Sequence, residues 1–245
     1  MYYVPKILVA TPTYEGKNYC LEEFIDNVAN FSYPRSRFDF MIFDNSKEPS
    51  NAKMINQKYG VKVHWRDYSG MTIIQKLAET HEAIRQHAIN NHYDYLLHLE
   101  SDVFPPTDVI EQLLFTKKNI IGVPYNLFGG GQRRLVTQGF QEGDIASDYF
   151  VSALTMGHHH HWFFDGNVKR VSTNGIGCTL MKVNTIGNIP FRYVEGDVAA
   201  PDTWFTRDLL SMKIPYYVHT GMLCFHWSNE DWGAYADLLK YDKND

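Results

Sequence analysis

A short apolar run that ends in acid constrains the fold of this chain more than any other stretch. Tyr95–Leu99 is too short to span a membrane and is typical of a strand buried on both faces, as in a parallel sheet covered by helices. Glu100 and Asp102 follow where that strand should emerge, and in open α/β sheets ligands bind outside the carboxyl ends of the strands. Carboxylates placed there can hold a hard divalent cation against phosphate oxygens. The alternative is a plain acidic turn in which Asp108 caps the next helix.

Strand-like and helix-like segments alternate before this run. Strands are expected at 7–10, 38–43 and 61–65, and helices from about residue 21 and from residue 73. This β-α-β-β-α-β order within about a hundred residues predicts a mostly parallel α/β sheet flanked by helices. Three loops at one edge of such a sheet carry acid or hydroxyl groups: 11–15, 44–46 and 100–102. Together they should surround one crevice, and a pocket of this kind suits a nucleoside diphosphate.

Composition and cysteine usage narrow the classes of partner. The chain has 245 residues and fits one large α/β domain. Its formal net charge of -5 argues against a generally basic nucleic-acid binder, although it leaves room for a local basic groove. Cys20, Cys178 and Cys224 are an odd set without CxxC spacing, which favours a reducing cytoplasm over a disulfide framework. No window reaches the roughly 20 apolar residues of a spanning helix, so we expect no transmembrane segment.

The pattern is less regular in the second half of the chain. From 124 to about 170 it predicts an irregular lobe that builds the site of a second substrate. Four histidines at 158–161 lie in this lobe, and a solvated or packing role suits them better than a metal site, because adjacent side chains point apart. Strand character returns after a glycine turn at 174–177, which either brings the backbone close to a ligand or forms a bulge.

Six short motifs follow one another along the chain. They are Thr11-Pro12-Thr13-Tyr14-Glu15 after the first strand, Asp44 after the second, Glu100-Ser101-Asp102, Asn174-Gly175-Ile176-Gly177, Asp202-Thr203-Trp204-Phe205, and His226 after the last strand. In this order they resemble the nucleotide-sugar-dependent glycosyltransferases of the GT-A fold, closest to the inverting family 2 enzymes. The third motif stands in the place of that family's Asp-x-Asp and the fifth in the place of its Glu-Asp-x-x-Phe. The resemblance covers nearly the whole chain and implies a Rossmann-like α/β domain.

The resemblance implies a metal-dependent, inverting transfer of a sugar from a UDP- or GDP-sugar to an acceptor hydroxyl. Asp102 and His226 would coordinate Mn²⁺ or Mg²⁺, and the metal would hold the diphosphate. The residues that would contact the donor are Thr11, Tyr14, Glu15, Asp44, Lys76, Glu100 and Ser101. Gly175 and Trp204 would lie at the acceptor. The single domain, 1–245, would then divide into a nucleotide-sugar-binding half, 1–123, and an acceptor-binding and catalytic half, 124–245.

Asp202 is the expected catalytic base, which an inverting transfer needs within hydrogen-bond reach of the acceptor hydroxyl. Pro201 precedes it where the family has an acid, so Glu195 and Asp197 are alternatives. Asp202 could equally be an ordinary helix N-cap, whose backbone hydrogen bonds would lower its pKa. His226 has a similar alternative as a hydrogen-bonded core histidine.

Two other functions fit parts of the pattern. A nucleotidyltransferase shares a similar sheet and metal carboxylates, but its Gly-rich basic first loop is missing here. A non-catalytic nucleotide-binding or glycan-binding module would use the carboxylates structurally. The acceptor is open: the basic and aromatic residues at 132–134, 162–163 and 169–170 could contact nucleic acid, or they could form a solvated lobe above a sugar or lipid-linked acceptor.

Overall fold

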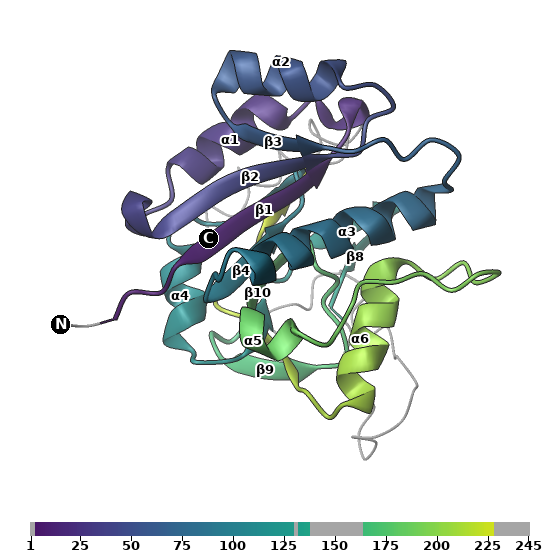
Figure 1. Cartoon of the computed structure of the whole chain (residues 1–245). Coiled ribbons are helices and arrows are strands. Elements are labelled where there is room, and N and C mark those ends of the chain that lie inside the picture. The colour runs from purple at the N-terminus through teal and green to yellow at the C-terminus, as the bar shows by residue number, and fades with distance from the viewer. Residues whose placement is uncertain (1–2, 130–131, 138–163, 228–245) are drawn as a thin grey trace.

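The computed structural model describes residues 3–129, 132–137 and 164–227. An eight-stranded sheet runs through this part of the chain (Figure 1). Its strands are β1 (Ile7–Thr13), β2 (Phe38–Asp44), β3 (Lys62–Trp65), β4 (Tyr95–Leu99), β6 (Ile120–Gly122), β9 (Val168–Val171), β10 (Cys178–Lys182) and β11 (Tyr216–His219). They are ordered β3-β2-β1-β4-β10-β6-β11-β9. β1 to β4 are parallel, and β10 runs antiparallel to both of its neighbours. The predicted α/β class is confirmed.

The two central strands are the ones that the sequence marks most clearly. All seven residues of β1 are buried, as are four of the five in β4, because helices cover both faces of the sheet. β4 has the bounds expected from the sequence. β1 is longer than expected, since Thr11, Pro12 and Thr13 continue the pairing with β2 instead of starting a loop.

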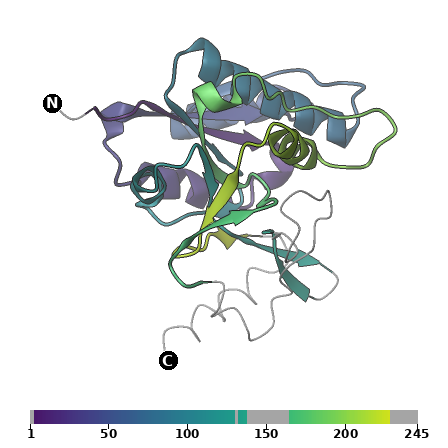
Figure 2. The same cartoon turned by 90° about the horizontal axis from the view of Figure 1, so that it is seen from below.

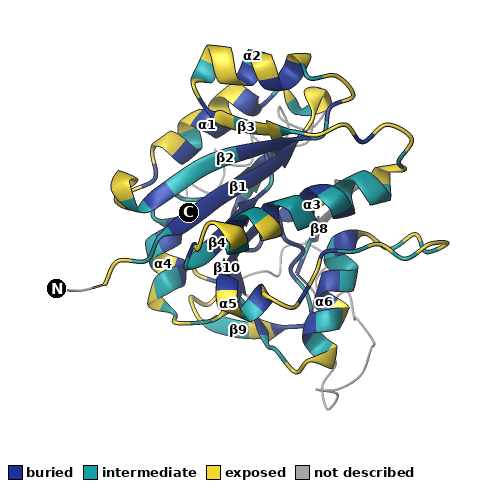
Figure 3. Cartoon of the chain, in the orientation of Figure 1, coloured by how far each residue is buried: buried dark blue, intermediate teal, exposed yellow. Residues whose placement is uncertain are grey.

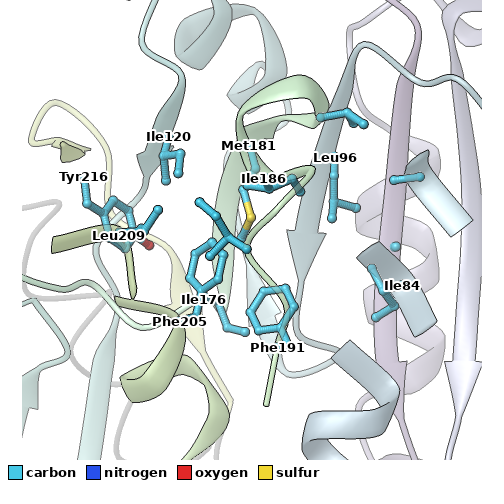
Figure 4. Packing of buried hydrophobic residues seen from close by; sticks show 14 of the residues in the cluster. Ile84, Leu96, Ile120, Ile176, Met181, Ile186, Phe191, Phe205, Leu209 and Tyr216 are labelled. Atoms are coloured by element: carbon cyan, nitrogen blue, oxygen red, sulfur yellow. The ribbon is translucent and has the colours of Figure 1, made fainter. Parts of the chain in front are cut away.

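Helices form a layer on each side of the sheet (Figures 1 and 2). They are α1 (Leu21–Ala29), α2 (Ser50–Tyr59), α3 (Ile73–Asn90), α4 (Val109–Phe115), α5 (Val183–Ile186) and α6 (Pro201–Ser211), with 3-10 turns η1 (Glu15–Lys17) and η2 (Arg35–Arg37). One core cluster joins α3, α5 and α6 to one face of the sheet. In Figure 4, Ile84, Ile186 and Phe205 of these helices surround Met181 and Leu96 of the sheet. A second cluster joins α1 and α4 to the opposite face.

Some helices are predicted clearly by the sequence and others are not. α3 begins with a complete capping box, in which Thr72 Oγ1 accepts from the Gln75 N–H and Gln75 Oε1 accepts from the Thr72 N–H. α2 was not expected, and the order at the N-terminus is therefore β-α-β-α-β-α-β. It buries Asn51, Ala52 and Ile55 while its other side chains stay partly or fully exposed (Figure 3), so its apolar stripe is too narrow for periodicity to detect.

Two small ladders flank the main sheet. β5 (Val103–Phe104) pairs antiparallel with β12 (Phe225–His226), and β7 (Asn126–Gly129) pairs with β8 (Gln132–Leu135). The lobe expected to be irregular thus contains a hairpin and, in β9, an edge strand of the main sheet. The histidines at 158–161 and the aromatic pair at 162–163 lie outside the described residues. Within the described ranges, no helix is both long and apolar enough to cross a membrane.

Candidate active site

The three loops expected to converge lie together at the carboxyl edge of the sheet. β1 and β2 end in register, with Thr13 opposite Asp44. Thr13 Oγ1 donates to Ser101 Oγ (3.1 Å), which joins the end of β1 to the turn after β4. The Glu15 N–H donates to Ser46 Oγ (2.9 Å), and the Ser46 hydroxyl donates to Asp44 Oδ1 (2.5 Å). Short side chains therefore connect the first loop to both of the others.

Two adjacent cavities open at this edge and share Asn45. The first, of about 200 Å³, is lined by Pro12, Thr13, Tyr14, Lys17, Asn45, Leu77, His81, Glu100, Ser101 and Asp102. The second, of about 170 Å³, is lined by Asn45, Ser46, Lys47, Tyr68, Ser69, Gly70 and Lys76. Of the expected donor residues, Tyr14, Glu100 and Ser101 thus line the first cavity and Lys76 lines the second.

The other expected donor residues, Thr11, Glu15 and Asp44, line neither cavity. Thr11 is fully buried inside β1 and Asp44 is 1% exposed. Thr11 Oγ1 and Asp44 Oδ2 have no hydrogen-bond partner among the described residues. Burial raises the pKa of Asp44, and the hydrogen bonds from Ser46 only partly offset this rise. A contact between either residue and a nucleoside stays a prediction.

Asp102 and His226 are brought together by the β5–β12 ladder. His226 pairs with Val103, the residue after Asp102, and the Trp227 N–H donates to the Asp102 carbonyl (2.8 Å). His226 Nε2 lies 3.3 Å from Asp102 Oδ2. Its other ring nitrogen, Nδ1, lies 2.7 Å from the Asn126 carbonyl, which can only accept, so Nδ1 carries a hydrogen in either charge state of the ring, and Nε2 donates to the carboxylate when the ring is protonated. The expected pair of ligands is therefore adjacent and has a fixed orientation.

Lys17 is the residue of this cluster that the sequence did not reveal. Its ammonium group contacts Asp102 Oδ2, the same oxygen that faces His226. Burial alone would raise the pKa of Asp102, but the hydrogen bond from His226 and the charge of Lys17 hold it below its ordinary value. Burial would likewise lower the pKa of His226, and Asp102 raises it instead. The carboxylate is thus ionised and already attracts one cation.

These residues fit a divalent cation bound chiefly by phosphate. No group of three or more His, Cys, Asp or Glu side chains that could hold a metal occurs in the part of the chain that the structure describes. Asp102 and His226 would supply two ligands, and Mg²⁺ and Mn²⁺ commonly complete such a set with substrate phosphates and water. The hydrogen bond from His226 Nδ1 to the Asn126 carbonyl orients the ring as in metal sites, where the second nitrogen is held by an acceptor.

Glu100 and Asp202 are close enough for the charge of Asp202 to act on Glu100. The Glu100 N–H donates to the Gly177 carbonyl (2.8 Å), which fixes the start of the acidic turn. Burial, followed by the negative charges of Asp102 and Asp202, raises the pKa of Glu100 to about 7. Burial also raises the pKa of Asp202, although the Thr203 N–H donates to its Oδ1 (2.8 Å) and opposes the rise. Both carboxyl groups are therefore better proton acceptors than exposed ones.

Asp202 does not cap α6. Ala200 holds the N-cap position, Pro201 is the first helical residue, and Asp202 lies in the first turn. The alternative of an N-cap is therefore wrong, because the proline, not the acid, starts the helix. Of the two alternative bases, Glu195 is exposed and Asp197 accepts from the Ala199 N–H (2.8 Å); like Asp202, neither lines the two cavities.

The glycine turn before β10 packs against Tyr125. A Cβ on Gly175 would lie 2.6 Å from the Tyr125 hydroxyl oxygen, and one on Gly177 would lie 2.6 Å from Tyr125 Cζ. Gly175 also has a positive φ of 59°, which disfavours a side chain. The Gly177 N–H donates to the Tyr125 hydroxyl (3.2 Å). The close approach at this turn is therefore to a buried tyrosine of the protein, and acceptor contact by Gly175 remains a prediction.

Trp204, the other expected acceptor residue, is in contact with two arginines. The guanidinium carbons of Arg192 and Arg207 are 4.5 and 4.7 Å from the centre of its ring system. Arg192 in turn forms two hydrogen bonds with Asp208, of 2.9 and 2.8 Å. Trp204 Nε1 has no partner within the described ranges. Stacking of a sugar on Trp204 would thus compete with cation–π contacts that already use the ring.

A pair of buried histidines stands behind the first cavity. His81 Nδ1 lies 2.9 Å from His98 Nε2, and His98 Nδ1 lies 2.9 Å from the Ile176 carbonyl. His81 belongs to α3 and lines the cavity, whereas His98 is fully buried in β4. The pair links the wall of the first cavity to the glycine turn. The sequence signals for the pair are a histidine inside the apolar run 95–99 and a histidine, His81, on the apolar stripe of the helix that begins at residue 73.

The fold of this chain is similar to that of solved glycosyltransferase structures. No family model matches the sequence, and no curated protein sequence matches it. Residues 1–349 of S. aureus TarS in complex with UDP-GlcNAc align with 92% of this chain at a TM-score of 0.54 and 12% identity. A mannosyltransferase from Pyrobaculum calidifontis in complex with GDP-Man and Mn²⁺ aligns with 95% at a TM-score of 0.55 and 15% identity. The chain has the GT-A fold. It spans 60% of the length of each of these two structures.

The GT-A assignment confirms the resemblance at the level of the fold. The solved structures named above are a nucleotide-sugar complex of TarS and a GDP-Man complex of a mannosyltransferase. At 12% and 15% identity, the likeness concerns the arrangement of the sheet and helices. The function must therefore be argued from the residues at the carboxyl edge.

Proposed function

We propose that this chain is a metal-dependent, inverting glycosyltransferase that moves a sugar from a UDP- or GDP-sugar to an acceptor hydroxyl. The observation that carries the proposal is the pair formed by Asp102 and His226 at the carboxyl edge of a GT-A sheet. Its imidazole is oriented by the Asn126 carbonyl and its carboxylate is 4% exposed. The two solved complexes with nucleotide sugars support the proposal at the level of the fold.

The first cavity and the adjoining one would hold the donor. Tyr14, which is 45% exposed, offers a ring for the base, and Lys76 offers a positive charge in the adjoining cavity. Asp102 and His226 would hold Mn²⁺ or Mg²⁺, which when bound neutralises charge on a diphosphate. Donor binding would therefore depend on the half of the chain before residue 124, with His226 as the one contribution from the other half.

Asp202 would accept the proton of the acceptor hydroxyl. Its raised pKa suits a base, because a carboxylate with few charge partners holds a proton more firmly than an exposed one. Glu100, which has a pKa of about 7, would gain and lose a proton near neutral pH in the neighbourhood of Asp202. In this proposal the half from residue 124 onward, which contributes Asp202 and the glycine turn, binds the acceptor.

A panel of UDP- and GDP-sugars tests the proposal. Each sugar is incubated with the protein with and without Mn²⁺, and release of UDP or GDP is measured, since many transferases slowly transfer the sugar to water. We expect release from one nucleotide class, dependent on the metal. Metal-dependent binding without release would instead favour a non-catalytic module. The proposal would be refuted if the protein neither bound nor hydrolysed any nucleotide sugar of the panel.

A further inference from the structure

The position of Lys17 suggests a role beyond a structural ion pair. Its ammonium group and His226 Nε2 approach the same oxygen, Asp102 Oδ2. The Lys17 side chain is 30% exposed and the Asp102 side chain 5%, so the cation has a path to solvent that the carboxylate lacks. A divalent ion bound by Asp102 and His226 would need the place that this ammonium group occupies.

Hydrogen bonds attach the segment that follows Lys17 to residues that flank the two strands of the β5–β12 ladder. The Cys20 thiol donates to the Ser101 carbonyl (3.4 Å), and the Tyr19 hydroxyl donates to the Trp227 carbonyl (2.8 Å). The Lys17 carbonyl accepts from the Cys20 N–H (3.3 Å). The backbone of Lys17 is therefore held beside the acidic turn, and its long, flexible side chain reaches Asp102 from a position that is partly open to solvent.

We infer that Lys17 is an exchangeable counter-ion: it neutralises Asp102 while no divalent metal is bound, and a metal must displace it to bind. The inference rests on the proposed function only for the identity of the displacing ion. Without Lys17, Asp102 would be a buried carboxylate with a histidine as its remaining partner, and such a group attracts cations more strongly than a paired one.

The same turn carries Tyr14, which is proposed to contact the nucleoside base of the donor. The Lys17 N–H donates to the Tyr14 carbonyl (2.9 Å), and the Tyr14 ring lies over Gly16, where a Cβ would be 2.3 Å from Tyr14 Cε2. A ligand that moves the Tyr14 ring therefore acts on the turn that positions the ammonium group. Lys17, which contacts Asp102, and Tyr14, which is proposed to contact the nucleoside base, thus belong to the same turn.

Calorimetric titration with MnCl₂ alone tests the inference without requiring activity. Wild type is compared with Lys17→Met, which keeps the length of the side chain and removes its charge, and with Lys17→Arg, which keeps the charge. Lys58→Met is the matched control, because Lys58 forms an exposed ion pair with Glu22 (2.6 Å) on another part of the surface. We expect Lys17→Met to bind Mn²⁺ roughly tenfold more tightly than wild type. Lys17→Arg and Lys58→Met should resemble wild type.

Two results would overturn the inference. Lys17→Met that is folded, as judged by circular dichroism, and binds Mn²⁺ no more tightly than wild type would show that no exchange takes place. Metal-free binding of UDP or GDP that is present in wild type and lost in Lys17→Met would show that Lys17 itself holds the phosphates. Failure of the sugar-transfer part of the proposed function is distinguishable, because it is measured as UDP or GDP release from the nucleotide sugars, whereas the Mn²⁺ titration contains no sugar donor.

Discussion

Stability should fall in mild acid because of the buried pair His81 and His98. The Ile176 carbonyl can only accept, so His98 Nδ1 carries the hydrogen and its Nε2 accepts from His81 Nδ1. Both rings are then neutral. Burial lowers the pKa of His98 to about 4 and lowers that of His81 well below its ordinary value of 6.5. A proton on His98 would break the hydrogen bond and place a charge in the core.

The size of the effect follows from the difference between the folded and unfolded pKa values. Between pH 6.5 and about 4 the unfolded chain binds a proton at His98 that the folded chain does not. Stability is therefore lost as the pH falls through this window, and above it the pair has no effect. At about 1.4 kcal/mol per pH unit, His98 alone should cost about 2 kcal/mol at pH 5 and about 3 kcal/mol at pH 4.

Urea unfolding followed by circular dichroism at pH 7.5, 6.5, 5.5 and 5.0 measures this loss. The matched variant is His98→Gln, whose amide can donate to the Ile176 carbonyl and whose carbonyl can accept from His81, without titrating. Other histidines titrate in both proteins and cancel in the comparison. Wild type should lose about 2 kcal/mol more than the variant between pH 7.5 and 5.0. Parallel losses in the two proteins would refute the assignment of His98 as a neutral buried ring.

Three substitutions at the carboxyl edge give further expectations. Asp102→Asn should abolish the Mn²⁺-dependent part of UDP or GDP binding in calorimetry, and unchanged metal dependence would contradict a role as ligand. Asp202→Asn should keep donor binding and reduce transfer by about 10²–10⁴-fold, whereas normal transfer would exclude it as the base. Gly177→Ala should cost about 1–3 kcal/mol in urea unfolding, because its Cβ would lie 2.6 Å from Tyr125 Cζ. Tyr125→Leu in the same chain should recover part of that loss, and a purely additive loss would argue against the clash.

The sequence predicts the fold well where a segment is buried on both sides. β1 and β4 are visible as apolar runs because water reaches neither face, and their order with α1 and α3 fixes the parallel half of the sheet. α2 was missed because it lies at the edge and buries only Asn51, Ala52 and Ile55. The end of β1 was placed too early, since Thr11 and Pro12 are typical of turns although the pairing with β2 continues through them.

The acidic residues of the candidate site can be predicted from the sequence, whereas the contacts between its residues are harder to predict. Asp102, Glu100 and Asp202 are marked by their places at the ends of strands and at the start of a helix. The contact between Asp102 and His226, 124 residues apart, arises from tertiary structure that no local pattern encodes. The role of Lys17 is equally hidden, because a lysine in a polar loop is ordinary until its partner is known.

Local opening of the β5–β12 ladder would separate two residues of the candidate site. It joins only two residues of each strand, and it is separate from the main sheet. Short ladders open at a lower free energy than strands in the middle of a sheet. Separation of β12 from β5 would carry His226 away from Asp102 while the strand pairing of the eight-stranded sheet is kept. The cation position can therefore be disassembled in a protein that is still folded, and a stability measurement alone would not detect it.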